Sequence, residues 1–230
     1  MNDERIPVEN RYSGTLEEHN RKILALTPAN STLREVVGYE VRRLYQEGMR
    51  VVDIGCGEGE SAEPVLRHSN ASVVLVDTSA DMINKCKRRL AKYGARTFYI
   101  RADARLHLQH CKTPYDIITS SWVFHNFEWP DKRRLFEAIR AGINPKGAFI
   151  LMDKVYPATD DKKLLDAQCA RYKYLDPKVW RAIIAHEEID FRYPYRMDEE
   201  ELVVCLHDVG FRRVRIVDRV ERDVVIVAQK

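Results

Sequence analysis

The sequence predicts an α/β protein whose core is a doubly wound, seven-stranded and mostly parallel sheet. From residue 49 to residue 158, short β-branched runs alternate with amphipathic helical segments, which is the pattern of successive βα units. A glycine-rich turn follows the first of these runs. The chain finishes with two β-branched runs only a few residues apart, so we expect them to pair as an antiparallel hairpin that completes the sheet.

Seven segments are expected to be strands because they are short, rich in valine and isoleucine, and bounded by turn residues. They cover residues 49–55, 72–79, 96–103, 115–124, 148–156, 211–220 and 222–230. Helices are expected at 31–48, 61–69, 79–94 and 130–143, with a further helix containing "HLQHC" between the third and fourth strands.

Several of these helices carry boundary signals. The first is expected to end at Gly48. Ser79 can cap the start of helix 79–94, and Gly94 suits the position just after its end. Pro130 opens helix 130–143, as proline does at a first helical position, and the turn "NPKG" then leads into the fifth strand.

Composition excludes several classes of protein. At 230 residues, with 45% hydrophobic and 32% charged side chains, the chain is long enough to bury the core of one large domain. Its net charge of +3 is spread along the chain and gives little support for a polyanion-binding surface. Because the chain has neither an apolar signal region at its start nor a run of roughly 18 apolar residues, we expect a cytoplasmic protein without a membrane segment. The five scattered cysteines form no C-x-x-C pair, so we expect no metal site.

The turn in "VVDIGCGEGE" predicts a place where a ligand lies against bare backbone. Both dinucleotides and S-adenosylmethionine bind at such glycine-rich turns between a strand and a helix. The dinucleotide fingerprint G-x-G-x-x-G requires its third glycine where this chain has Glu60. Glu60 and Asp53 repel a pyrophosphate but tolerate a sulfonium and an ammonium. S-adenosylmethionine is therefore the expected cofactor.

Two more acids end the next two strands. Asp77 ends the second strand, where a carboxylate can accept both ribose hydroxyls. Asp103 ends the third strand, in "RADA", where it can accept a hydrogen bond from an adenine amino group. Each acid alone is equally well explained as a helix cap or turn former, but one acid per βα unit in succession favours a cofactor site.

These motifs resemble those of the class I S-adenosylmethionine-dependent methyltransferases, and the resemblance covers residues 30–230. "VVDIGCGEG" is similar to the motif against the methionine part, "RADA" to the adenine-binding motif, and "SSWVFHNF" to the stretch that passes beside the sulfonium. The resemblance implies a Rossmann-like fold with S-adenosylmethionine as cofactor. The residues expected to bind it are Asp53, Gly55, Cys56, Gly57, Asp77, Thr78, Met82, Asp103, Ala104, Ser120 and, from the N-terminal segment, Tyr12.

A closer likeness is to the carboxy-S-adenosylmethionine synthases, which serve tRNA wobble-uridine modification. "DMINKCKRRL", "INPKGAFILMDK" and "LHDVGF" are similar to their counterparts there. The arginine that those enzymes use to hold the extra carboxylate falls at Cys205, and a cofactor-contacting tyrosine falls at Asn30. Because an unpaired carboxylate loses much of its binding energy, we expect ordinary S-adenosylmethionine and methyl transfer.

We expect one domain with four parts. Residues 1–48 form a helical segment that covers the cofactor site, and 49–156 form the S-adenosylmethionine-binding core. Residues 157–198 form a helical lid and substrate insertion, and 199–230 end the sheet. The insertion follows the fifth strand, so it emerges at the carboxyl ends of the strands, where open α/β sheets bind ligands.

The expected reaction is in-line methyl transfer to a small-molecule acceptor in a closed site. His125, just beyond the fourth strand, and His186, in the insertion, are the candidate general bases. A packing or cofactor-positioning role is the alternative for the first, and a solvated helix face for the second. Tyr172, Trp180 and Tyr195 are the candidate substrate contacts.

Other functions stay open at this point. The aromatic segments "RYKYL" and "FRYPYRM" are compatible with base stacking, but residues 157–200 have no net positive charge, so nucleic acid is not the expected partner. The histidines of "HLQHC" have plausible metal spacing but fit the predicted helix better. A non-catalytic cofactor-binding protein is the alternative from another class, and a homodimer is left open.

Overall fold

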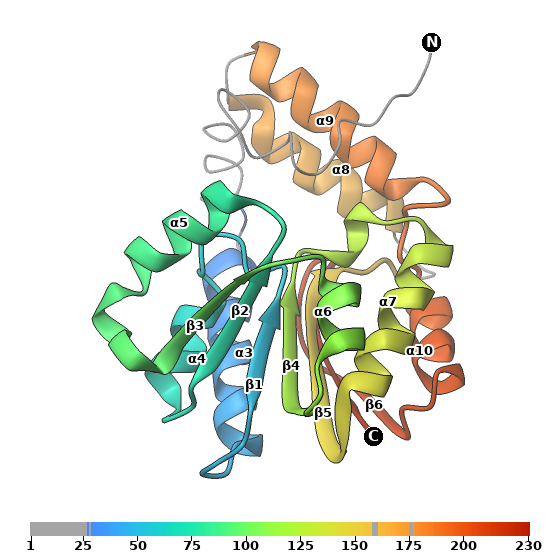
Figure 1. Ribbon diagram of the computed structural model, residues 1–230. Coiled ribbons are helices and arrows are strands. Elements are labelled where there is room, and N and C mark those ends of the chain that lie inside the picture. The colour runs from blue at the N-terminus through green and yellow to red at the C-terminus, as the bar shows by residue number, and fades with distance from the viewer. Residues whose placement is uncertain (1–26, 28, 158–160, 175–176) are drawn as a thin grey trace.

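The computed structural model describes residues 27, 29–157, 161–174 and 177–230 (Figure 1). Within these residues the strands form one seven-stranded sheet in the order β3-β2-β1-β4-β5-β7-β6. They are β1 (Val51–Ile54), β2 (Val73–Asp77), β3 (Thr97–Arg101), β4 (Tyr115–Ser121), β5 (Ile143–Lys154), β6 (Arg213–Val220) and β7 (Asp223–Gln229). β1 to β5 are parallel, whereas β7 pairs antiparallel with both β5 and β6. The predicted fold class and its C-terminal hairpin are confirmed.

Helices cover both faces of this sheet (Figure 1). One face packs against α3 (Ala29–Leu44), α4 (Ala62–His68) and α5 (Ala80–Arg89). The other packs against α6 (Ala104–His110), α7 (Trp129–Gly142) and α10 (Glu199–Asp208). Because successive side chains of a strand point to opposite faces, Val51 enters the first apolar cluster and Val52 the second. Both faces of the sheet are therefore covered by helices. The carboxyl ends of the parallel strands are where an open sheet of this kind can bind a ligand.

Local signals explain several boundaries, whereas the predicted ends of two helices, the role of Gly94 and the start of the fifth strand need correction. Ser79 caps α5 as predicted, since its hydroxyl accepts a hydrogen bond from the Met82 amide at 3.3 Å. α3 ends at Leu44 rather than at Gly48, which lies in the following turn with φ +85°. α5 ends at Arg89, because the buried Leu90 leaves the helical conformation there. The other two corrections concern Gly94 and the turn "NPKG".

Gly94 does not cap α5. It breaks a 3-10 helix, Ala91–Arg96, where it has φ 53° and ψ −123°. The turn "NPKG" lies inside β5, which begins at Ile143, and the pairing register with β4 shifts between Tyr115 and Ile117. The shift accommodates the turn within the strand, so β5 starts five residues earlier than its apolar run.

The insertion after β5 is helical. It contains α8 (Asp161–Arg171), a 3-10 turn (Tyr172–Tyr174) and α9 (Pro177–Phe191). The chain then returns to the core through a bridge between Tyr156 and Asp198. Figure 1 shows α8 and α9 above the carboxyl ends of the parallel strands. The predictions for residues 1–26, including the cofactor contact Tyr12, lie outside the described residues.

Candidate functional site

The glycine-rich turn joins β1 to α4 and packs closely against the loop after β4. Gly55 has φ +68°, and a Cβ atom there would lie 2.4 Å from Val123 Cγ2. Gly57 has φ +52°, and a Cβ there would meet nothing within 4 Å. The amide of Gly57 donates to Asp77 Oδ2 at 2.9 Å. One glycine is thus required by packing, while the other leaves an open surface of bare backbone.

Asp53 is almost completely buried at the end of β1, with 1% of its surface exposed. Its Oδ1 accepts a hydrogen bond from the Thr119 hydroxyl at 2.8 Å, whereas Oδ2 is shielded from water and has no hydrogen-bond partner among the described residues. Burial raises the pKa of Asp53 to about 7, although the Thr119 hydrogen bond and the charge of Arg34 oppose the shift. An unsatisfied buried carboxylate oxygen costs stability, so this atom is available for a ligand.

Replacing Asp53 by asparagine is expected to change the pH dependence of stability. The pKa of the carboxyl is about 7 in the folded protein and near 3.8 in an unfolded chain, so the folded state retains a proton between these values. The stability of the unliganded protein therefore falls as pH rises from about 4 to about 7. Relative to wild type, Asp53→Asn gains about 2–4 kcal/mol across that window. Urea unfolding at pH 4 and pH 8 measures the difference, and a pH-independent difference would contradict the burial of a titrating group here.

Asp77 and Asp103 occupy the ends of the neighbouring strands. Both oxygens of Asp77 accept backbone N–H bonds, from Ser79 and from Gly57, each at 2.9 Å. Burial raises the pKa of Asp77 despite these bonds. Asp103 caps α6, with Oδ1 accepting from the amides of Arg105 and Leu106. Each carboxylate keeps further lone pairs, so these structural roles are compatible with ligand contacts.

The remaining predicted cofactor residues lie in the glycine turn, near the start of α5, at the start of α6 and on β4. Cys56 is 6% exposed, and its thiol pKa is raised by a hydrogen bond with Cys86 and by burial. Met82 is buried in the first turn of α5, and the Thr78 carbonyl accepts a bond from Arg101. Ala104 is the first residue of α6. The Ser120 hydroxyl is used inside the sheet, where it donates to the Ile54 carbonyl at 3.1 Å.

His125 lies in the short helical turn Phe124–Asn126 after β4 and is paired with a buried carboxylate. Its Nδ1 is 2.7 Å from Asp153 Oδ1, and the two side chains are 8% and 0% exposed. Asp153 Oδ2 accepts the backbone amides of Val123 at 3.1 Å and Phe124 at 2.7 Å. The acid near the end of β5 therefore fixes both the loop and the imidazole. The sequence singled out His125 but not Asp153, although the signal for Asp153 was an acid near the end of a strand that lies beside the strand before His125.

The loop that carries His125 begins with an unusual residue. Trp122 has φ +53°, in the left-handed region that costs a non-glycine residue about 1–2 kcal/mol. Its indole donates to Asp223 at 2.8 Å, and the guanidinium carbon of Arg34 lies 5.0 Å from its ring centre. These partners hold Trp122 between the glycine turn and the start of β7.

The second candidate base lies on α9. His186 Nε2 is 3.7 Å from Asp190 on the same helix, and its side chain is 37% exposed. The buried acids of this helix, Glu187 and Asp190, both bind Lys154. His125, by contrast, lies in the loop whose Val123 packs against Gly55 of the glycine turn.

The candidate substrate residues are separated. Tyr172 is buried in a small cluster with Ile183, and Trp180 packs against this cluster. Tyr195 is held at the start of α7, where its hydroxyl donates to Glu128 at 3.1 Å. These three aromatic side chains do not form one surface, because two of them fill the interior of the lid.

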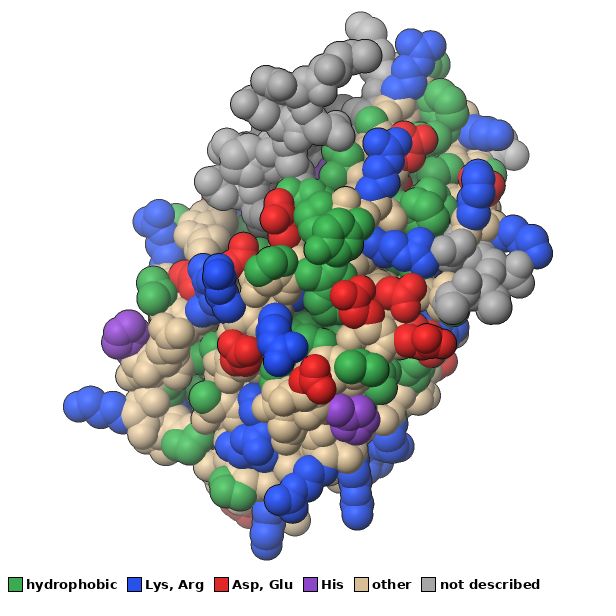
Figure 2. Space-filling model, turned by 90° about the vertical axis from the view of Figure 1, so that its right-hand side faces the viewer, with side chains coloured by type: hydrophobic (Ala, Val, Ile, Leu, Met, Phe, Trp, Pro, Cys, Tyr) green, Lys and Arg blue, Asp and Glu red, His purple; other side chains and the backbone are tan. Residues whose placement is uncertain are grey.

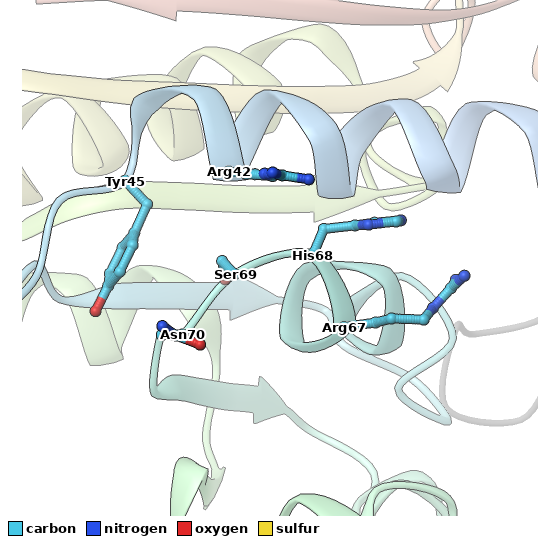
Figure 3. Close-up of a pocket in the computed structure, with 6 residues that line it drawn as sticks. All are labelled: Arg42, Tyr45, Arg67, His68, Ser69 and Asn70. Atoms are coloured by element: carbon cyan, nitrogen blue, oxygen red, sulfur yellow. The ribbon is translucent and has the colours of Figure 1, made fainter.

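A separate pocket of about 320 Å³ lies at the opposite edge of the sheet (Figure 3). Its lining comes from the ends of α3 and α4 and from the segment before β2: Arg42, Tyr45, Arg67, His68, Ser69 and Asn70. Glu35 pairs with His68 at 2.7 Å and also with Arg67. Basic side chains at helix C-termini offset the helix dipoles, so this pocket has a structural explanation and is remote from the glycine turn.

Among the described residues, no three His, Cys, Asp or Glu side chains are grouped so that they could hold a metal ion. In "HLQHC", His107 Nε2 instead contacts the Tyr115 hydroxyl at 2.9 Å. In the same part of the chain, no helix has the length and apolar character needed to cross a bilayer.

Comparison with known proteins bears on the predicted family. The methyltransferase-domain family matches residues 51–147, which run from β1 to the beginning of β5 and contain the glycine turn, Asp77, Asp103 and His125. This match covers less than half of the chain. The predicted resemblance to the class I S-adenosylmethionine-dependent methyltransferases is confirmed, and the cofactor of that family, S-adenosylmethionine, is the one that the sequence predicted. The residues fit it, since the turn offers an open backbone at Gly57 and an unsatisfied carboxylate oxygen at Asp53.

Relatives extend the comparison. Over 137 residues this chain is 32% identical to the carboxy-S-adenosyl-L-methionine synthase of Enterobacter sp. (strain 638), and the alignment covers 55% of this chain and 52% of that protein. The chain thus spans about half the length of the curated relatives it matches.

Two solved structures share the fold. An O-methyltransferase family protein from Burkholderia thailandensis has a TM-score of 0.70 at 13% identity, covering 96% of this chain and 62% of that one. The phosphoethanolamine N-methyltransferase 2 of Haemonchus contortus, solved with phosphomonomethylethanolamine and S-adenosylhomocysteine, has a TM-score of 0.63 at 18% identity, covering 90% and 44%. At these identities the likeness shows the fold alone.

Proposed function

We propose that the chain transfers the methyl group of S-adenosylmethionine to a small-molecule acceptor, with His125 as general base. The observation that carries the proposal is the buried His125–Asp153 pair, whose nitrogen and oxygen lie 2.7 Å apart. Because Asp153 accepts from Nδ1–H, Nε2 is the nitrogen left with its lone pair for a proton. Val123, two residues before His125, would touch a Cβ on Gly55, so this loop lies against the cofactor turn.

The side chains divide the work of the reaction. Bound S-adenosylmethionine supplies an electrophilic methyl group on a sulfonium. The glycine turn, Asp53, Asp77 and Asp103 bind and orient the cofactor, with Cys56, Thr78, Met82, Ala104 and Ser120 around it. His125 accepts the proton that a hydroxyl or protonated amine must lose, Asp153 holds the imidazole, and α8 and α9 exclude water.

Cofactor binding is the first test. Calorimetric titration of the purified protein with S-adenosylmethionine, S-adenosylhomocysteine, carboxy-S-adenosylmethionine and NAD is expected to give micromolar binding of the first two and none of NAD. A panel of small alcohols, phenols, amines and thiols is then screened for formation of S-adenosylhomocysteine. Binding of NAD alone would overturn the cofactor assignment, and binding without turnover of any acceptor class would favour a non-catalytic binding protein.

The second candidate is a carboxy-S-adenosylmethionine synthase-like activity, which the relatives' names favour. The position of the carboxylate-binding arginine holds Cys205, a thiol 6% exposed in the apolar cluster beside Leu202 and Leu206. That side chain offers no cation. If carboxy-S-adenosylmethionine nevertheless binds more tightly than S-adenosylmethionine in the same titration, the second candidate is the correct one.

A small acceptor fits the surface better than a nucleic acid. Figure 2 shows acidic side chains among basic ones across the middle of one face of the described residues, with mostly basic side chains along its lower edge. Nucleic-acid binding depends on concentrated positive charge, and the net charge of only +3 supports a small molecule. A cytoplasmic location and a homodimer stay predictions.

A further inference from the structure

The pocket at the ends of α3 and α4 is lined by several polar side chains that have no partner within the protein (Figure 3). Arg42 lies in the last turn of α3, Tyr45 just after this helix, and Asn70 in the segment before β2. No hydrogen bond or ion pair joins the Arg42 guanidinium, the Tyr45 hydroxyl or the Asn70 amide to another described residue. Polar groups from separate segments therefore line one hollow of about 320 Å³ and are free to bind a ligand.

The pocket carries more positive charge than the protein neutralises. None of its six lining residues is acidic. The nearby acid Glu35 pairs with Arg67 and, at 2.7 Å, with His68 Nε2. Arg42 follows Glu35 by seven residues on the same face of α3, but this carboxylate is already occupied. Arg42 and Arg67 thus outweigh Glu35, and an anion in the pocket would complete the balance of charge.

Helix dipoles account for only part of this arrangement. At the carbonyl end of α4, Arg96 donates to the Leu66 carbonyl at 2.8 Å and to the Ser69 carbonyl at 2.5 Å. A cation outside the pocket lining therefore already offsets the dipole of that helix. Arg42 donates to no carbonyl in the part of the chain that the structure describes. Its guanidinium is in place for a ligand rather than for the helix end.

We propose that this pocket binds the phosphate group of a small dianion, either inorganic phosphate or a phosphomonoester. Arg42 and Arg67 suit phosphate, because each guanidinium can donate two parallel hydrogen bonds to its oxygens. The His68 imidazole, the Tyr45 hydroxyl and the Asn70 amide supply further donors beside them. A volume of about 320 Å³ is within the range of small-molecule sites, so it also admits the organic part of an ester. The site is separate from the glycine turn and does not rest on the proposed function.

A titration followed by amide NMR tests the site directly. Inorganic phosphate and ribose 5-phosphate are added separately, with the ionic strength held constant by sodium chloride, because salt alone screens surface charges. We expect the amide signals of residues 67–71 to shift with a millimolar dissociation constant, while those of residues 55–59 in the glycine turn stay in place. The probe that binds more tightly identifies the source of the phosphate group. No shift with either probe, or shifts confined to the glycine turn, would overturn the proposal.

Arg42→Gln and Arg43→Gln form a matched pair of variants. Each removes one positive charge from an exposed position on α3, but Arg43 is paired with Glu40 at 2.6 Å and does not line the pocket. We expect Arg42→Gln to weaken phosphate binding by about tenfold or more, and Arg43→Gln to weaken it by less than about twofold. Equal weakening by the two variants would mean that phosphate responds only to net charge, and this result would overturn the site.

Asn70→Asp tests the charge of the pocket from its other side. The new carboxylate supplies the acid that the lining lacks, so we expect it to abolish the phosphate-dependent shifts. Since Arg42, Arg43 and Asn70 are all exposed, we expect the three variants to fold, and thermal unfolding checks this. A folded Asn70→Asp variant that binds phosphate as well as wild type does would contradict the proposed site.

Discussion

Replacement of His125 by alanine is expected to lower kcat by about 10²- to 10⁴-fold with a hydroxyl or amine acceptor, the range typical of a lost general base. The affinity for S-adenosylhomocysteine is expected to change much less, because the imidazole is held by Asp153 beside the cofactor turn rather than within it. Initial rates of S-adenosylhomocysteine formation, with an acceptor found in the screen, measure the first effect. Calorimetry measures the second.

Controls separate a base from a packing residue. Added imidazole is expected to restore part of the activity of His125→Ala, because a small base can enter the space left by the side chain. Asp153→Asn is expected to lower kcat in the same direction, since the amide no longer offers a carboxylate to Nδ1. His186→Ala is expected to stay within about twofold of wild type, because its side chain is 37% exposed and lies 3.7 Å from Asp190 on its own helix. Full activity of His125→Ala would contradict the role of His125 as general base and would favour a role in packing or in positioning the cofactor.

Local sequence patterns predicted the fold well because each strand and helix is amphipathic or apolar in its own right. The cap at Ser79 and the hairpin of β6 and β7 depend on residues close together in the chain, so both could be predicted. Gly94 was misassigned because a glycine suits any turn, and burial of Leu90 ended α5 earlier. The strand ends also predicted where Asp77, Asp103 and His125 lie in the sheet, whereas their roles stay predictions.

The partners of the site residues could not be predicted in the same way. Asp153 lies 28 residues from His125, and Arg34 lies 26 residues from Glu60. These contacts arise only when separate elements pack, so no periodicity signals them. Likewise, the sequence shows that the insertion is rich in aromatic residues but not which of them fill its own interior, and Tyr172 does.

Replacement of Glu187 by glutamine is expected to cost about 3–5 kcal/mol in the stability of the lid, the usual effect of breaking a buried ion cluster on one side. Glu187, on α9, is 5% exposed and lies 3.1 Å from the Lys154 ammonium near the end of β5. Its other oxygen, Oε2, lies 2.6 Å from a guanidinium nitrogen of Arg222, the residue before β7. The two side chains form an ion pair, but this nitrogen does not meet the criteria for a hydrogen bond. Burial would lower the pKa of Lys154, but Glu187 and Asp190 outweigh it and raise the pKa. Both cations therefore depend on the lid acids.

Hydrogen exchange measures this cost where it arises. Protection of the α9 amides is expected to fall by about 10²- to 10³-fold in Glu187→Gln, while β1 and β4 keep theirs. Glu188→Gln is the matched control. Glu188 is 50% exposed on the same helix, and it forms a long ion pair, 3.7 Å from Arg192. We expect the stability of α9 to change by less than about 0.5 kcal/mol in this variant. Equal effects of the two variants would mean that the buried cluster does not hold the lid. A selective effect would mean that Lys154, at the end of β5, holds α9 on the core through the charges of the buried acids. Because Asp153, the residue before it, pairs with His125, the position of α9 and the orientation of His125 would then depend on the same strand end.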